Sequence, residues 1–198
     1  MTTDTAERQT SLPIAGAPAE AGVPVRLHDV LDLAVRATAG RITREDIDLL
    51  KATICPKFTD AQLALYVRVC DLKKVDPFSQ AYGFPNEDGG LAFGLRIDGM
   101  RALAMRTGEY LSRTVETLLV PEGEKVGQLL GARATVQRKG MAAPIVEEAF
   151  MAEYYRKGHG WEQYPETMIR KVAESKALRA AFPDALSGVY EPAEMEHE

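Results

Sequence analysis

The chain has 198 residues, of which 45% are hydrophobic and 27% charged, values typical of one packed globular domain. No apolar run reaches the roughly 18 residues that a membrane-spanning helix needs, and no basic segment followed by an apolar one marks a secretory signal. The two cysteines, Cys55 and Cys70, are too few for a disulfide framework. We therefore expect a cytoplasmic protein with free thiols and no membrane contact.

The net charge of −5 is concentrated near the C-terminal end. Residues 184–198 contain five acidic side chains and no lysine or arginine. Residues 1–183 are balanced, with 24 basic and 24 acidic side chains. Such a body can carry a basic groove, so the composition permits DNA binding without indicating it.

The first part of the chain predicts a leader followed by helices. Residues 1–25 are rich in Ala, Thr and Pro without a helical period, and we expect them to be disordered. A stripe of apolar residues predicts a helix that Gly40 ends, and its members are Leu27, Val30, Leu31 and Ala34. A second helix opens at 43–46 and is closed by Pro56, with Ile47, Leu50 and Ile54 expected inward. A third begins at the capping-box pair Thr59 and Gln62, and its expected buried residues are Leu63, Tyr66, Val67 and Cys70, the last as a core thiol.

The rest of the chain predicts an antiparallel sheet and two helices. Strands at 80–85 and 91–96 flank the turn 86–90, and a helix over 97–107 ends at Gly108. Strands follow at 110–120, 128–138 and 144–150, and a long helix runs from Pro165, which suits a first helical turn, to about Phe182. This order predicts an α+β fold, a hairpin plus a three-stranded meander packed with helices. We assign 26–192 to one core domain and 193–198 to an acidic tail.

The sequence lacks the residues that several kinds of catalytic and metal site require. The G-x-x-x-x-G-K-[ST] loop that cradles nucleotide phosphates is absent. The cysteines and histidines are too scattered for a zinc site, and the acidic residues are not clustered as a metal-dependent nuclease requires. We expect no cofactor, no metal and no covalent catalysis, which leaves a binding protein.

Four segments carry a family signature. They are Asp76-Pro77-Phe78 with Tyr82-Gly83-Phe84-Pro85; Ile97-Asp98-Gly99-Met100-Arg101 continuing to Tyr110; Trp161, Pro165, Met168 and Lys171 through Phe182-Pro183; and Leu186-Ser187-Gly188-Val189-Tyr190. In this order, over about residues 45–192, they resemble the Red-beta/RecT family of phage single-strand annealing proteins. The resemblance implies an annealing-superfamily core with a helix on an antiparallel sheet, and a phage or prophage protein of the bacterial cytoplasm. It also implies binding of single-stranded DNA, annealing to a complementary strand without ATP, and assembly into rings or filaments.

The sequence departs from the family at two points. Relatives of the Red-beta type often carry basic residues just after the proline that opens the last long helix, where this chain has Glu166 and Thr167. Longer relatives continue into a module that contacts a partner phage exonuclease and the host single-strand binding protein. This chain ends within about ten residues of Tyr190, which leaves both partnerships in doubt.

Annealing requires phosphates to be held while base edges stay free to pair. The DNA-binding candidates are therefore basic residues and one aromatic residue: Arg170, Lys171, Lys176, Arg179, Arg138, Lys139, Arg156, Lys157, Arg101, Arg106 and Trp161. Solvated surface charge is the alternative for Lys139 and Lys157, and a core or subunit contact is the alternative for Trp161.

Arg179 is the most informative candidate. On a helical wheel it lies between Met168 and Val172, where an amphipathic helix places core residues. A long basic side chain there needs either a buried carboxylate or a DNA phosphate, and we favour phosphate for Arg179 and for Lys171.

We interpret Asp98-Gly99 as a helix start rather than a metal site. A recombination-associated nuclease and a non-catalytic phage assembly or regulatory module remain alternative functions.

Overall fold

The structure is a computed structural model that describes residues 27–85, 89–123 and 127–195. The leader expected over 1–25 and the last three residues of the expected acidic tail lie outside this range. So do residues 86–88 of the expected turn at 86–90 and residues 124–126.

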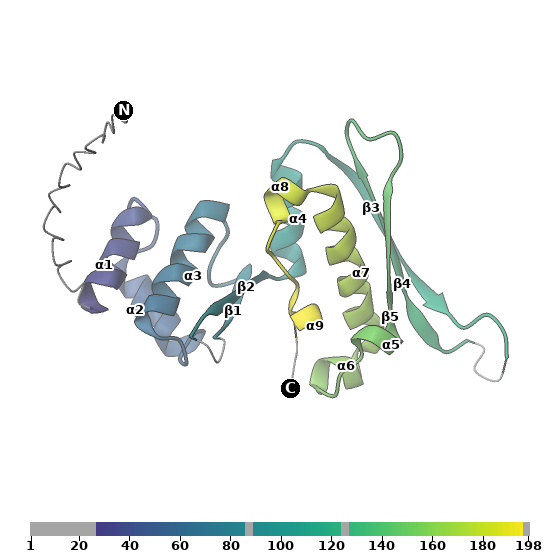
Figure 1. Ribbon diagram of the computed structural model, residues 1–198, viewed down its shortest axis with the longest axis horizontal. Helices are drawn as coiled ribbons and strands as arrows, with labels where there is room; N and C mark the ends of the chain where they lie inside the picture. The colour runs from purple at the N-terminus through teal and green to yellow at the C-terminus, as the bar shows by residue number, and fades with distance from the viewer. Residues whose placement is uncertain (1–26, 86–88, 124–126, 196–198) are drawn as a thin grey trace, which may run out of the picture.

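The N-terminal lobe consists of three helices and a hairpin (Figure 1). Its elements are α1 (Leu27–Ala37), α2 (Arg44–Thr53), α3 (Asp60–Lys73), β1 (Ala81–Pro85) and β2 (Leu91–Leu95). Both α2 and α3 begin at a complete capping box, Thr43 with Asp46 and Thr59 with Gln62, in which side chains satisfy the free amides of the first turn. The side chains predicted to face inward from α3 are all fully buried: Leu63, Tyr66, Val67 and Cys70.

One predicted core residue of this lobe is wrong. Ile47 and Leu50 are buried, but Ile54 is 38% exposed. Ile54 is the C-cap residue of α2 and still has a helical backbone, with its amide bonded to the Leu50 carbonyl. It is exposed because it lies at the end of the helix, where fewer residues cover it.

The C-terminal lobe is a three-stranded antiparallel sheet with helices on one face. Its elements are α4 (Ile97–Arg106), β3 (Tyr110–Leu119), β4 (Leu129–Arg138), β5 (Ile145–Phe150), α5 (Met151–Tyr154), α6 (His159–Gln163), α7 (Pro165–Ala181), α8 (Pro183–Leu186) and α9 (Pro192–Met195). The strand order is β3-β4-β5. The small residues Ala132 and Ala134 of β4 are fully buried on the face that α7 covers, which lets the helix pack closely on the sheet. The predicted α+β class and both antiparallel sheets are confirmed.

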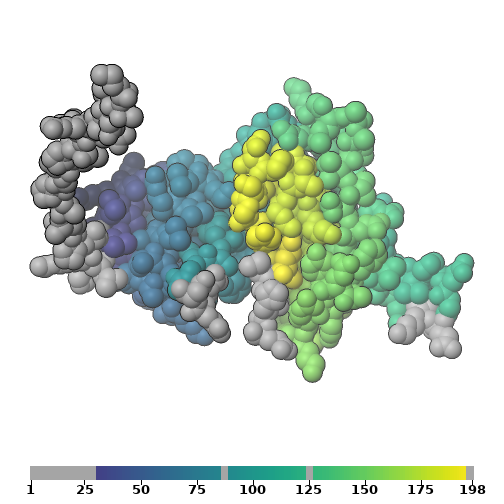
Figure 2. All heavy atoms as spheres, in the orientation of Figure 1, coloured from purple at the N-terminus to yellow at the C-terminus, as the bar shows by residue number. Residues whose placement is uncertain are grey.

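The C-terminal segment, yellow in Figure 2, lies between the two lobes and contacts both. The Tyr190 carbonyl accepts hydrogen bonds from the Leu95 amide (2.9 Å) and from the Tyr82 hydroxyl (2.8 Å). Tyr190 also forms a parallel bridge with Gly94. A Cβ atom at Gly94 would lie 2.1 Å from the Tyr82 ring, so only glycine leaves room for that ring. In the part of the chain that the structure describes, no helix is both long and apolar enough to cross a bilayer.

Candidate nucleic-acid interface

A hollow of about 430 Å³ lies between α4, β3 and α7. Its lining combines four basic side chains, two acidic side chains and three others: Arg101, Arg113, Arg170, Lys171, Asp98, Glu174, Ile97, Val115 and Thr167. We refer to these nine residues as the basic hollow. The formal charge of its lining is positive, in contrast to the negative charge of the whole chain.

Strand alternation and helical spacing bring these residues together. Arg113 and Val115 pair with Val136 and Ala134 of β4, both buried beneath α7. Because side chains of paired residues lie on one face of a sheet, Arg113 faces α7 rather than the opposite side. On α7, Thr167, Lys171 and Glu174 follow one another at intervals of four and three residues, which places them on one stripe of the helix.

Glu174 is the centre of the basic hollow. Its carboxylate accepts hydrogen bonds from Arg101, with Nε to Oε1 at 2.6 Å and Nη2 to Oε2 at 2.7 Å. Arg113 Nε lies 3.0 Å from the same Oε1. The Glu174 side chain is only 4% exposed, whereas those of Arg101 and Arg113 are about one-third exposed. The hydrogen bonds that Arg101 donates to Glu174 raise the pKa of its guanidinium, which keeps it charged at any working pH.

The rim of the basic hollow carries cations with weaker partners. Arg170 donates to the Thr117 hydroxyl at 3.0 Å and lies 3.8 Å from Glu166. Lys171 forms no ion pair or side-chain hydrogen bond with any residue that the structure describes, and it is half-buried. The buried Glu174 therefore fixes two arginines, while Lys171 remains available for an external anion. This arrangement suits phosphate groups, which most protein–DNA hydrogen bonds contact.

The sequence profile of the RecT family matches residues 40–198, well over half of the chain. The chain belongs to the RecT family. The match agrees with the four segments that resemble Red-beta and RecT. No curated protein matches this RecT-family chain.

The structure shows the carboxylate alternative for Arg179, not the phosphate contact that we favoured. Both terminal nitrogens of its guanidinium lie 2.6 Å from the two carboxylate oxygens of Glu194 in α9. The guanidinium carbon also lies 5.0 Å from the centre of the Tyr190 ring. Its charge is thus compensated within the protein, and the basic hollow does not include it.

The prediction of Trp161 as a DNA-binding residue is also corrected. Its side chain is fully buried, and its ring packs edge-on against Tyr155 with the centroids 6.3 Å apart. A buried ring offers no face on which a base could stack. The core alternative is therefore the one that the structure shows.

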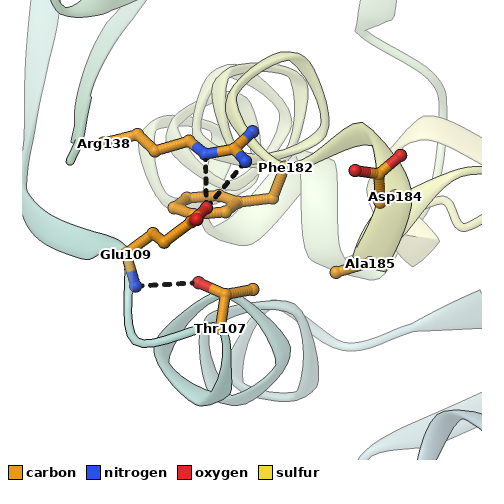
Figure 3. A pocket seen from close by; sticks show the side chains of 6 residues that line it. All are labelled: Thr107, Glu109, Arg138, Phe182, Asp184 and Ala185. Carbon is orange, nitrogen blue, oxygen red and sulfur yellow. Dashed lines mark hydrogen bonds and ion pairs between the residues drawn. The ribbon is translucent and has the colours of Figure 1, made fainter. Parts of the chain in front are cut away.

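Two further candidates are tied to other parts of the C-terminal lobe. Arg138 lines a separate hollow of about 390 Å³ with Glu109 and Phe182 (Figure 3). Its Nη2 lies 2.6 Å from a Glu109 carboxylate oxygen, and its Nη1 donates to the Ala181 carbonyl at 2.8 Å. Lys176 donates to the Glu148 carbonyl at 2.6 Å. These contacts attach the end of α7 to the sheet.

The remaining candidates are exposed and lie outside the basic hollow. Arg106 donates to the main-chain carbonyls of Lys73 and Lys74 at the end of α3. Lys139 follows the end of β4, and Arg156 and Lys157 lie in the loop between α5 and α6. Of the eleven candidates, the structure gathers only Arg101, Arg170 and Lys171 into the hollow.

Three polar residues of the basic hollow, Arg113, Thr167 and Glu174, were not among the predicted site residues. Arg113 could have been found, because strand alternation places it on the same face as Val115. Thr167 was noted only as a departure from the family. Glu174 gave no signal, because α7 carries five other charged residues and nothing local distinguishes this one from them. Among the described residues, no group of three or more His, Cys, Asp or Glu side chains could hold a metal ion, and Asp98 instead forms an ion pair with Arg101 at 2.7 Å.

Proposed function

We propose that this protein binds single-stranded DNA through the basic hollow and anneals it to a complementary strand. Membership of the RecT family implies single-strand annealing in phage recombination. The observation that carries the proposal for this chain is a hollow lined by four basic side chains, two of which are paired with one buried carboxylate. In this arrangement the cations hold phosphates, which fix a strand without reading its sequence, and the base edges stay free to pair.

Annealing by this protein needs no nucleotide and cuts no strand. The sequence lacks a phosphate-cradling loop, and pairing of complementary strands is itself energetically favourable. The protein contributes by holding a strand extended and by raising its local concentration. It is therefore a binding protein rather than an enzyme, and it acts in the bacterial cytoplasm where phage DNA recombines.

Several subunits act together on one strand. A single basic hollow contacts few nucleotides, and single-strand binding proteins of this kind bind cooperatively along a strand. Large apolar side chains lie exposed on α3 and on the sheet, among them Leu65, Leu72, Leu111 and Val146. Exposed apolar surface of this kind supports contacts between subunits.

The proposal is tested by mixing two complementary oligonucleotides, one with a fluorophore and one with a quencher, in the presence of the protein and EDTA without nucleotide. Accelerated quenching with both strands intact on a denaturing gel supports the proposal. Shortened strands would indicate the nuclease alternative, and an unchanged pairing rate the regulatory one. Light scattering of the same mixture should detect particles much larger than one subunit, and a strictly monomeric protein would contradict cooperative assembly.

A further inference from the structure

A second group of cations lies where α3 of the N-terminal lobe and α4 of the C-terminal lobe end. Its members are Arg41, Arg68, Lys73, Lys74 and Arg106, and we refer to them as the helix-end cluster. Figure 1 shows the last turns of α3 and α4 on the same side of the molecule, near α8. Lys73 of α3 donates to the Ala185 carbonyl of α8 at 3.3 Å, which fixes this proximity.

Three members of the helix-end cluster surround one carboxylate. Asp71 is only 6% exposed and forms ion pairs with Arg41, with Arg68 at 3.2 Å and with Lys74 at 3.8 Å. Arg41 also donates to the Asp71 carbonyl at 3.4 Å. One negative charge is therefore shared by three cations whose side chains are 47%, 43% and 60% exposed.

Helix capping explains only part of this charge. Arg68 donates to the Ala37 carbonyl at the end of α1, and Arg106 donates to the Lys73 carbonyl at 3.1 Å. Cations stabilise a helix C-terminus, but that end carries only about half a negative charge. Even with Asp71 and the nearby Asp76 counted, the five cations of the cluster leave a clear positive excess.

A hollow of about 240 Å³ lies beside the helix-end cluster, and its lining includes two of the five cations, Arg41 and Lys74, together with both nearby carboxylates. It is lined by Arg41, Ile42, Cys70, Asp71, Lys74, Val75, Asp76 and Pro77. Asp76 is engaged with its own loop, because its carboxylate accepts hydrogen bonds from the Phe78 amide at 2.9 Å and from the Ser79 hydroxyl. The donors of Arg41 and Lys74 that Asp71 does not use can therefore meet an anion from outside.

We propose that the helix-end cluster is a second phosphate-binding site, distinct from the basic hollow, which contacts the DNA backbone during annealing. This inference rests on the proposed annealing function. The helix α4 connects the two sites, since Arg101 lies in the basic hollow and Arg106 in the cluster. The two residues are five positions apart, roughly 7.5 Å along the helix axis. The backbone at the second site belongs either to the strand already held in the hollow or to the incoming complementary strand.

The test uses Lys74→Gln, with Lys57→Gln as the matched control. Lys74 contributes least to the fold, because it is the most exposed and most distant of the three partners of Asp71. Lys57 lies exposed on the same lobe, outside the cluster and without an ion pair among the described residues, so it controls for the loss of one charge. Binding of a non-complementary oligonucleotide and annealing of a complementary pair are each measured against salt concentration.

The proposal predicts that Lys74→Gln lowers the salt slope by about 0.7, the value of one single-strand phosphate contact, and that Lys57→Gln does not. A lower slope for the lone oligonucleotide assigns the site to the strand in the hollow. A lower slope for annealing alone assigns it to the incoming strand. Adding Arg106→Gln should about double the loss.

Unchanged slopes for Lys74→Gln and for the double variant would overturn the second site, as would a change confined to particle size in light scattering. That last result would point instead to a contact with an acidic surface of another subunit. If the unaltered protein itself failed to bind or anneal DNA, the proposed function would fail, and this is a different result from unchanged slopes in an active protein.

Discussion

Arg179 of α7 and Glu194 of α9 form a two-point ion pair, with both nitrogen–oxygen distances at 2.6 Å. The Arg179 side chain is 22% exposed and that of Glu194 only 7%. The Glu194 carboxylate also accepts a hydrogen bond from the Ser175 hydroxyl and one from the Glu191 amide. The pair therefore fastens the segment after α8, which joins the two lobes, to the long helix.

Arg179→Ala should destabilise the protein without altering DNA binding by the folded fraction. Removing one partner of a buried ion pair leaves the other charge uncompensated, which costs about 3 kcal/mol or more. A denaturant titration followed by circular dichroism measures the loss. The exposed Arg156 serves as control, since Arg156→Ala should change stability by less than about 0.5 kcal/mol.

The double variant Arg179→Ala/Glu194→Gln separates this explanation from a simple loss of packing. With the charge of Glu194 removed, part of the lost stability should return, because no buried carboxylate remains unpaired. An Arg179→Ala protein with normal stability and a reduced salt slope would instead return Arg179 to the DNA interface.

Glu174→Gln should strengthen binding of single-stranded DNA and weaken the fold. The substitution keeps the shape of the side chain but removes the negative charge that Arg101 and Arg113 share. Both guanidinium groups then carry a positive charge that is no longer compensated and can bind phosphate more strongly. The affinity for single-stranded DNA should therefore rise, and the melting temperature of the free protein should fall. Adding oligonucleotide should restore the melting temperature further than it does for the unaltered protein. Weaker binding by a folded Glu174→Gln protein would show that Glu174 mainly orients the two arginines.

The two thiols should not react while the protein is folded. Cys55 and Cys70 are buried, and burial raises the pKa of the Cys55 thiol to about 11 and also raises the pKa of Cys70. A raised pKa leaves little of the reactive thiolate near neutral pH. A thiol reagent such as DTNB should therefore label both cysteines in denaturant and neither in native buffer. Rapid native labelling of either residue would contradict its place in the core.

Much of the fold was predictable because local patterns determine it. Apolar spacing located α2 and α3, the latter together with the capping-box pair Thr59 and Gln62. The three strands of the larger sheet were predicted to within about two residues. The helices α5, α6, α8 and α9 were missed, since elements of four or five residues are too short to show a helical period.

The candidate site was harder to predict because long-range pairing decides which cations are free. The helical wheel indicated that Arg179 needs a partner, but nothing local points to Glu194, which we had placed in an acidic tail. Arg101 and Glu174 are 73 positions apart, so their pairing follows only from the packing of α4 against α7. The fold supplies Arg179 with the Glu194 carboxylate but leaves Lys171, which lines the hollow, without an ion pair among the described residues. No local pattern in the sequence distinguishes the two residues.

The most direct test of the central claim is the salt dependence of single-strand binding by Lys171→Ala. Lys171 lines the basic hollow without a partner among the described residues, so its removal should leave the melting temperature unchanged. The affinity should fall similarly for different sequences, and the slope of log affinity against log salt should become shallower by about 0.7, whereas Lys57→Ala should leave both unchanged. A Lys171→Ala protein with unaltered affinity and slope would contradict DNA binding in the hollow between α4, β3 and α7.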